Sequence, residues 1–141
     1  MEKTKFTASG ITGTERAQVS QAPVRQSVLV VDDEENFLTL LKWYLTQHGY
    51  DVYTASSADE ANGILQERSI NIALLDIKLG GRDGLSLLEQ VNEQSPEVKV
   101  VMMTAFPTVS SIKQAFDKGA VRYMTKPVDL QELAEALKIL P

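Results

Sequence analysis

Residues 28–35 read Val-Leu-Val-Val-Asp-Asp-Glu-Glu, an apolar run that ends abruptly in four acidic side chains. Continuous runs rich in β-branched residues, such as 28–31, are typical of strands buried on both faces of a parallel sheet. After the acidic residues, apolar side chains recur at helical spacing over 35–48. The stretch therefore predicts a buried strand, a connection that carries Asp32 and Asp33, and a helix.

The same alternation of strand and helix continues along the chain. It is typical of a parallel sheet covered by helices on both faces, and short right-handed crossovers favour a doubly wound arrangement. We therefore predict an α/β fold: a doubly wound, five-stranded parallel sheet with five helices, of flavodoxin-like topology. The segment 77–83 is predicted to be a loop. Further strands are predicted at 51–55, 72–76, 98–103 and 121–125, and helices at 57–68, from about 84, at 109–118 and at 129–139.

Length and composition exclude several classes of protein. A chain of 141 residues has room for one domain. It contains no cysteine and a single histidine, which excludes disulfide scaffolds, thiolate metal sites and sites built from several imidazoles. No apolar run approaches the roughly 20 residues of a membrane-spanning helix, and the N-terminus has no secretory signal. We therefore expect a cytoplasmic protein that does not associate with membranes.

The charges divide the chain into two parts. Residues 1–26 hold four basic and two acidic side chains and no apolar period, so they are predicted to form a flexible N-terminal tail. Residues 27–141 hold ten basic and seventeen acidic side chains and are predicted to form the folded domain. Because an acidic domain repels phosphate backbones, this chain is not expected to bind nucleic acid directly.

Polar side chains follow the predicted strands where parallel strands share an edge, which is where ligand sites form in doubly wound folds. Asp32 and Asp33 follow the first strand, Asp76 ends the third, and Thr104 and Lys126 follow the fourth and fifth. Three crowded carboxylates repel unless a proton or a cation joins them, and an oxygen-only cluster suits Mg²⁺. A lysine and a hydroxyl opposite such a metal ion favour a phosphoryl group, with a carboxylate as its acceptor.

With these residues the chain resembles the receiver domain of bacterial two-component response regulators. The similarity covers roughly 27–139 and looks closest to receivers of the nitrogen-regulator type. The matching pieces are Val30-Val31-Asp32-Asp33-Glu34, Leu74-Leu75-Asp76, Asp83-Gly84, Met103-Thr104-Ala105 and Lys126-Pro127. The resemblance implies a phosphorylation-dependent signalling switch, not an enzyme acting on other substrates. It implies phosphoryl transfer from a histidine kinase or phosphotransfer protein, with Mg²⁺ as cofactor.

The resemblance also assigns roles at the metal and phosphoryl site. It implies that Asp76 is the phosphoacceptor and that Mg²⁺ is bound by Asp33, by Asp76 and by the main-chain carbonyl of Lys78. Asp32 would hold a metal-bound water. Lys126 would pair with the phosphoryl oxygens, and a cis Lys126–Pro127 peptide bond is expected.

Activation is implied to change one surface of the domain. Thr104 would hydrogen-bond the phosphoryl group, and Tyr123 would swing inward as Thr104 moves. The surface made by the fourth helix, the fifth strand and the fifth helix would then change for a downstream protein or an output domain.

Two departures from the commonest family pattern lie around the phosphoacceptor. Gly80 replaces the usual proline, which implies a more mobile loop. Lys78 and Phe106 occupy positions that flank the attacking water in the family. Our hypothesis is that these large side chains restrict water and prolong the life of the phosphoryl group.

A possible docking face lies on the first helix. Asn36, Leu40 and Trp43 share a side of the helix away from its core stripe, and an exposed Leu–Trp pair could anchor a partner. In the family, kinases and phosphotransfer proteins dock at this helix. A Trp43 that merely lies on the surface is an equally open interpretation.

Three other functions remain alternatives. One is a receiver-like scaffold that takes no phosphate. Another is an aspartate-nucleophile phosphatase, whose motif has a second Asp where this chain has Lys78. A flavodoxin-like binding module would need a phosphate-cradling loop where this chain has four acidic residues.

Overall fold

The computed structural model describes residues 24–141 and contains a five-stranded sheet in the order β2-β1-β3-β6-β7. Every neighbouring pair in it is parallel. The predicted α/β fold with five parallel strands and five helices is confirmed for this part of the chain. The strands are β1 (Ser27–Val31), β2 (Asp51–Ala55), β3 (Ile72–Asp76), β6 (Lys99–Thr104) and β7 (Arg122–Thr125). The helices are α1 (Glu35–Gln47), α2 (Ala58–Glu67), α3 (Gly84–Gln94), α4 (Val109–Asp117) and α5 (Leu130–Lys138).

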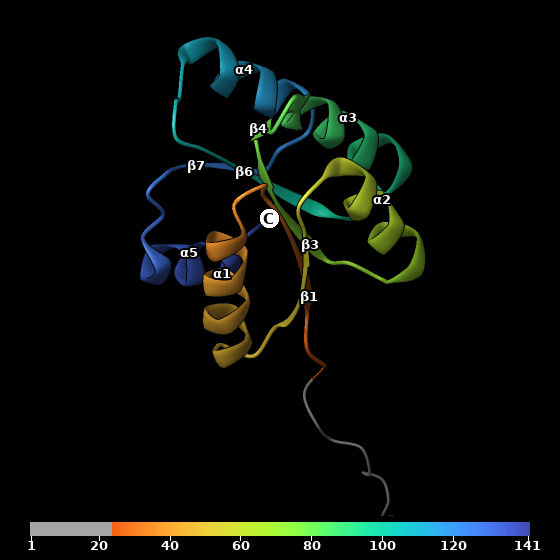
Figure 1. Cartoon of the computed structure of the whole chain (residues 1–141), viewed down its shortest axis with the longest axis vertical. Helices are drawn as coiled ribbons and strands as arrows, with labels where there is room; N and C mark the ends of the chain where they lie inside the picture. The colour runs from red at the N-terminus through yellow and green to blue at the C-terminus, as the bar shows by residue number, and fades with distance from the viewer. Residues whose placement is uncertain (1–23) are drawn as a thin grey trace, which may run out of the picture.

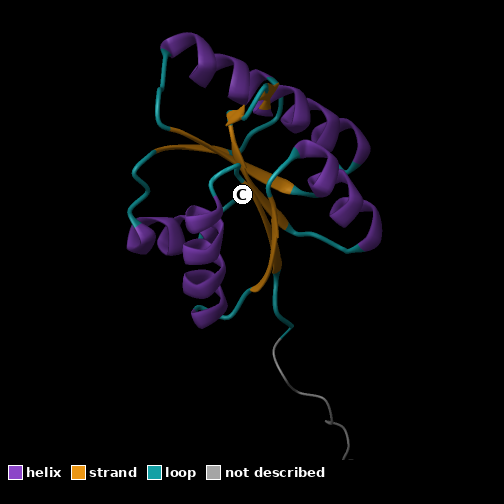
Figure 2. Ribbon diagram, in the orientation of Figure 1, coloured by secondary structure: helices purple, strands orange, loops and turns teal. Residues whose placement is uncertain are grey.

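The sheet is the middle layer of three (Figures 1 and 2). Helices α1 and α5 cover one face, and α2, α3 and α4 cover the other. Alternate residues of β1 enter the two cores: Leu29 and Val31 pack with α2 and α3, whereas Val28 and Val30 pack with α1 and α5. This two-sided burial explains why the strand sequences are continuously apolar rather than alternating.

Local signals in the sequence set several helix ends. Gly49, with a φ of 93°, follows the end of α1, a conformation that glycine adopts without strain. The side chain of Ser57 accepts a hydrogen bond from the Glu60 N–H (3.1 Å) at the start of α2. Asp129 does the same for Glu132 (2.9 Å) at the start of α5.

The prediction of a loop over residues 77–83 is wrong in one respect. It contains a two-stranded antiparallel hairpin, β4 (Lys78–Leu79) and β5 (Arg82–Asp83). Gly80 occupies its turn with a φ of 59°, which favours glycine. Such short strands leave no apolar run or alternation in the sequence, so periodicity could not reveal them.

The order of the strands fixes the place of the site. The chain passes from β1 to β2 on one side and then returns to β3 on the other side of β1. The carboxyl ends of β1 and β3 are therefore the point at which the strand order reverses, where doubly wound folds form their crevice.

The predicted tail 1–26 lies outside the described residues except for its last three. There, the Arg25 side chain donates to Asp51 (2.9 Å) and to the Tyr50 carbonyl (3.0 Å). Among residues 24–141, no helix has the length and apolarity needed to cross a membrane.

Candidate functional site

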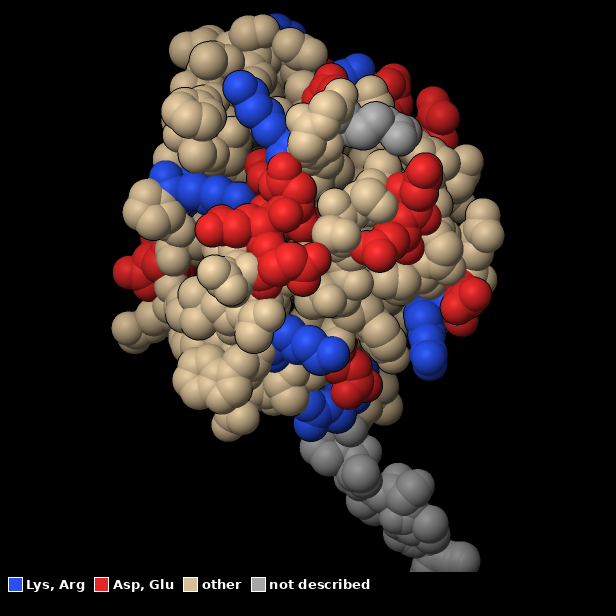
Figure 3. All heavy atoms as spheres, viewed as in Figure 1, with Lys and Arg blue, Asp and Glu red and all other residues tan. Residues whose placement is uncertain are grey.

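Three carboxylates meet at the carboxyl edge of the sheet. Asp32 and Asp33 directly follow β1, and Asp76 is the last residue of the adjacent strand β3. Each offers one oxygen, and these oxygens all lie within 4.8 Å of one another. Figure 3 shows acidic side chains gathered near the middle of one face of the molecule, with Lys or Arg side chains beside them. The strand register thus creates the predicted acidic cluster from two adjacent residues and a third that lies 43 positions beyond Asp33 in the sequence.

Asp32 is fully buried and is held from two sides. Its Oδ1 accepts a hydrogen bond from the Glu34 N–H (2.9 Å), which forms the turn into α1. Its Oδ2 accepts a hydrogen bond from the Lys126 ammonium group. A buried carboxylate requires such partners. Asp32 therefore fixes the position of Lys126 and of the turn into α1, and it also contributes negative charge to the site.

Asp76 is buried between two donors. The Lys78 N–H donates to Oδ1 (3.1 Å), and the Lys126 ammonium donates to Oδ2 (3.1 Å). Burial raises the pKa of Asp76 above its ordinary value, and the charge of Asp32 adds to this effect. The two hydrogen bonds and the charge of Lys126 act in the opposite direction but do not cancel it.

Lys126 reaches the cluster from the end of β7. Burial alone would lower its pKa, but the hydrogen bonds and charges of Asp32 and Asp76 outweigh burial and raise the pKa overall. Its ammonium nitrogen also lies 4.5 Å from the centre of the Phe37 ring. The Lys126–Pro127 peptide bond is cis, as the family resemblance implied.

Asp33 stands at the exposed rim of the cluster. Its Oδ2 accepts a hydrogen bond from the Gly80 N–H (2.9 Å), which ties the β4–β5 turn to the end of β1. A proline at position 80 has no N–H and could not make this bond. The departure at Gly80 therefore supplies a donor to the acidic cluster.

Thr104 and Tyr123 lie at the ends of the next two strands. Thr104 is buried, and its Oγ1 accepts a hydrogen bond from the Phe106 N–H (3.1 Å), which leaves its own O–H free to donate. Its main-chain carbonyl accepts from the Lys126 N–H (2.7 Å). Tyr123 is half-buried, and its hydroxyl lies 2.9 Å from the hydroxyl of Ser111 on α4.

Known proteins are similar to this chain in fold and in sequence. The family model for the response regulator receiver domain matches residues 28–138. The chain belongs to the response regulator receiver domain family. This receiver is similar to the alginate biosynthesis transcriptional regulatory protein AlgB of Pseudomonas aeruginosa, with 39% identity over 106 residues. The match covers 75% of this chain and 24% of AlgB, so the chain spans about a quarter of that relative's length. Relatives of this kind are consistent with the nitrogen-regulator type of receiver.

Two solved structures extend the comparison. A CheY-like response regulator receiver domain protein from Methanospirillum hungatei has 32% identity and a TM-score of 0.79, and the match covers 82% of this chain and 92% of that one. A response regulator protein from Burkholderia pseudomallei has 27% identity and a TM-score of 0.74, with coverage of 80% and 71%. The latter was solved with a phosphorylated aspartic acid, a calcium ion and citrate. This receiver therefore belongs to a class of two-component signalling switches.

Beside the site, Lys78 and Phe106 make a contact that the sequence did not predict. The Lys78 ammonium lies 5.2 Å from the centre of the Phe106 ring, which links β4 to the loop before α4. The Phe106 side chain is otherwise open to solvent, with 70% exposed. Lys78 and Phe106, the two residues that we expect to restrict water, thus contact each other next to the ends of β3 and β6.

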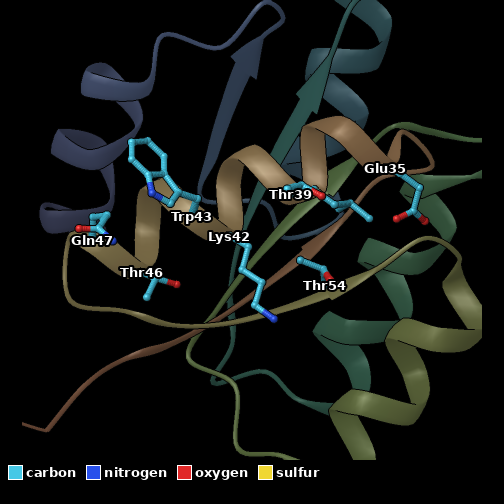
Figure 4. Close-up of a pocket in the computed structure, with 8 residues that line it drawn as sticks. Glu35, Thr39, Lys42, Trp43, Thr46, Gln47 and Thr54 are labelled. Carbon is cyan, nitrogen blue, oxygen red and sulfur yellow. The ribbon is translucent and has the colours of Figure 1, made fainter.

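The predicted docking face is exposed, as expected from its place off the core stripe of α1. Trp43 is 60% exposed, Leu40 is 43% exposed, and Asn36 is also on the surface. Trp43 lines a cavity of about 510 Å³ between α1 and β2. Figure 4 shows the Lys42 side chain extending from α1 toward Thr54, with the Trp43 ring standing out from the helix.

Two neighbours of the predicted site residues were also missed. Phe37 contacts Lys126, and Ser111 contacts Tyr123. In the sequence, Phe37 was visible only as an apolar position of a helix, and Ser111 only as a polar residue near a helix start. Their roles depend on side-chain reach across elements, which neither periodicity nor motif spacing reports.

Proposed function

We propose that this receiver accepts a phosphoryl group on Asp76 and thereby switches the surface formed by α4, β7 and α5. The observation that carries the proposal is the position of Asp76 Oδ2, which lies 3.1 Å from the Lys126 ammonium within a cluster of three carboxylates. An acidic cluster with one cation and a nearby free hydroxyl is suited to an incoming phosphoryl group. The phosphorylated aspartic acid of the Burkholderia pseudomallei relative supports the same chemistry here.

Mg²⁺ is the cofactor that fits this donor set. The grouped donors of Asp32, Asp33 and Asp76 are all carboxylate oxygens, which suit a hard divalent cation. Asp33, Asp76 and the main-chain carbonyl of Lys78 would hold the ion, and Asp32 would hold one of its waters. When bound, the ion supplies positive charge that offsets the carboxylates and the phosphoryl oxygens.

The transfer itself is a displacement at phosphorus. A carboxylate oxygen of Asp76 forms the new O–P bond, and the P–N bond to the donor histidine breaks, with its electron pair left on the imidazole nitrogen. Lys126 donates hydrogen bonds from its ammonium group to the phosphoryl oxygens and balances their growing charge. Thr104 donates its free O–H to another of these oxygens.

The switch follows from the new group on Asp76. The phosphoryl group carries roughly two negative charges and three acceptor oxygens, so it attracts Thr104 and Lys126. Movement of Thr104 opens space for the Tyr123 ring to turn inward. The surface of α4, β7 and α5 then shifts between two populations, which a partner can distinguish.

Partners are part of the same proposal. A histidine kinase or phosphotransfer protein would dock beside the site on Asn36, Leu40 and Trp43. A downstream protein or an output domain would recognise the switched surface, and direct nucleic-acid binding is not expected of residues 27–141 because of their negative charge. The division at residues 26 and 27 and a cytoplasmic location remain predictions from the sequence.

The test is the intact mass of the protein after incubation with Mg²⁺ and a small acyl phosphate, for the wild type and for Asp76→Asn. We expect the wild type alone to gain one phosphoryl group, and the gain to disappear when Mg²⁺ is chelated. No gain in either protein would contradict the proposal and favour a scaffold that takes no phosphate. An equal gain in both would place the acceptor elsewhere.

A further inference from the structure

Phe37 is an aromatic residue near the start of α1 that the proposed function does not yet use. Its ring is half-buried and packs against the core on the α1 and α5 side of the sheet. The ring also lines a cavity of about 380 Å³ beside the phosphoacceptor site. Other residues that line this cavity are Leu40, Ala105, Lys126, Pro127 and Val128. Phe37 therefore lies at the boundary between the core and the reacting groups.

The Lys126 ammonium has three donor hydrogens, and three side chains contact it among residues 24–141. Asp32 and Asp76 accept two hydrogen bonds from it. The ring of Phe37 lies 4.5 Å away and supplies a third neighbour. The face of an aromatic ring carries negative electrostatic potential and attracts an ammonium group, more strongly where water is excluded. Because the Lys126 side chain is only 17% exposed, this attraction is poorly screened.

A lysine side chain needs such a contact because its stem is flexible. Four rotatable carbons allow the ammonium to reach many positions, and each one fixed costs conformational entropy. The Phe37 ring beside Lys126 limits the positions of the ammonium and favours the one in which it contacts Asp76 Oδ2, where it can reach an oxygen of a group attached to Asp76.

We propose that Phe37 is a positioning residue for phosphoryl transfer, whose ring face holds the Lys126 ammonium where it meets the phosphoryl group on Asp76. The inference rests on the proposed function. In the reaction with acetyl phosphate, a carboxylate oxygen of Asp76 bonds to phosphorus, and the P–O bond to the acetyl group breaks as acetate leaves with the electron pair. Phe37 acts in this step through Lys126 and touches no reacting atom.

The experiment compares Phe37→Leu with Phe37→Tyr in the full chain. Leucine keeps an apolar side chain in the core but removes the ring face, whereas tyrosine keeps the ring and has the neighbouring cavity for its hydroxyl. We expect Phe37→Leu to lower the rate of phosphorylation by acetyl phosphate and the affinity for beryllium fluoride by about three- to tenfold. Phe37→Tyr should restore both values to within about twofold of the wild type. The affinity for Mg²⁺ alone should stay within about twofold, because Lys126 is not a metal ligand.

A nuclear magnetic resonance measurement reads the contact independently of the variants' activity. In the wild type, the ring should shift the Lys126 ε-methylene protons upfield of those of the other lysines, and Phe37→Leu should remove this shift. A residue that only filled core volume would change the melting temperature without this pattern.

The outcomes separate the two proposals. If the wild type takes up neither a phosphoryl group nor beryllium fluoride, the proposed function fails and this inference fails with it. If the wild type is phosphorylated but Phe37→Leu matches it, only this inference is overturned. An absent upfield shift in the wild type would likewise overturn the inference alone, whether or not Phe37→Leu folds.

Discussion

The hydroxyl of Tyr123 on β7 lies 2.9 Å from the hydroxyl of Ser111 on α4. Ser111 also takes part in the cap of α4: its Oγ accepts from the Thr108 N–H (3.1 Å), and its N–H donates to the Thr108 Oγ1 (3.0 Å). The first turn of α4 is thus connected to the aromatic residue that is proposed to move on activation. A turn of the Tyr123 ring inward would have to break this connection.

Removing the hydroxyl of Tyr123 should weaken the link without removing the ring. We expect Tyr123→Phe to lower the free energy of unfolding by about 1 kcal/mol, because one hydrogen bond is lost. Ser111→Ala should cost more, since it also removes part of the helix cap. Urea unfolding of both variants and of the double variant gives the coupling energy between them. A coupling energy of zero would show that the two hydroxyls do not stabilise each other.

A second close approach joins the start of α3 to β3, the strand that ends in Asp76. A methyl group added at Gly84 would overlap the main-chain carbonyl of Asp76, while the Gly84 N–H donates to the Ile77 carbonyl (2.6 Å). We therefore expect Gly84→Ala to destabilise the fold by roughly 2 kcal/mol or more, because backbone must move. Chemical denaturation monitored by circular dichroism measures this change.

Gly63→Ala is the matched control for Gly84→Ala. Gly63 lies in α2, and nothing stands within 4 Å of the position of an added methyl group. The same substitution should stabilise the protein there by about 1 kcal/mol, since alanine favours helix. Equal effects at the two positions would contradict the steric account of Gly84.

The fold was largely predictable because its strands are buried on both faces. Runs such as 28–31 and 72–75 are apolar throughout since both cores need them, and they alternate with helical patterns. The β4–β5 hairpin was not predictable in the same way. Its formation depends on the turn at Gly80 and on the bond from the Gly80 N–H to Asp33, neither of which leaves a periodic signal.

The candidate site also has a part that the sequence predicts and a part that it does not. The meeting of Asp32, Asp33 and Asp76 follows from strand ends, because parallel strands share one carboxyl edge. The contacts of Lys126 with Phe37 and of Lys78 with Phe106 depend on the rotamers of long side chains. Spacing in the sequence carries no information about those rotamers, so these contacts could not be predicted from it.

The raised pKa of Asp76 predicts a dependence of stability on pH. Burial is the main cause of the raised pKa. The unfolded chain therefore loses this proton at a lower pH than the folded protein, and stability falls as the pH rises from about 4 through the folded pKa. Without Mg²⁺, we expect the melting temperature of Asp76→Asn to lie roughly a few degrees above that of the wild type at pH 7. The difference should vanish below about pH 4.

Thermal unfolding across pH 4 to 7 without divalent cations is the measurement for Asp76→Asn. Glu93→Gln, which removes an exposed carboxylate of α3, is the control and should change little at any pH. Mg²⁺ should then stabilise the wild type more than Asp76→Asn, because a ligand that binds the folded state raises its stability. A variant less stable than the wild type at pH 7 without Mg²⁺ would contradict the prediction.

The contact between Lys78 and Phe106 is expected to lengthen the lifetime of a phosphoryl group on Asp76. If these side chains restrict water, changing both to alanine should speed hydrolysis by roughly three- to tenfold, equivalent to about 1 kcal/mol of barrier. Loss of the phosphorylated mass over time measures the rate. Lys113→Ala with Phe116→Ala changes the same residue types on α4 and should leave the rate unchanged. An unaltered rate in the Lys78 and Phe106 variant would refute the hypothesis.

Lys126 connects the end of β7 to carboxylates at the ends of β1 and β3. Its ammonium is in effect a counterion attached to the polypeptide by a four-carbon stem. A tethered ion has a high effective concentration that is set by its covalent connection, whereas free ions follow the composition of the solution. The protein therefore brings its own counterion to Asp76, and the supply of that positive charge is independent of the salts around the molecule.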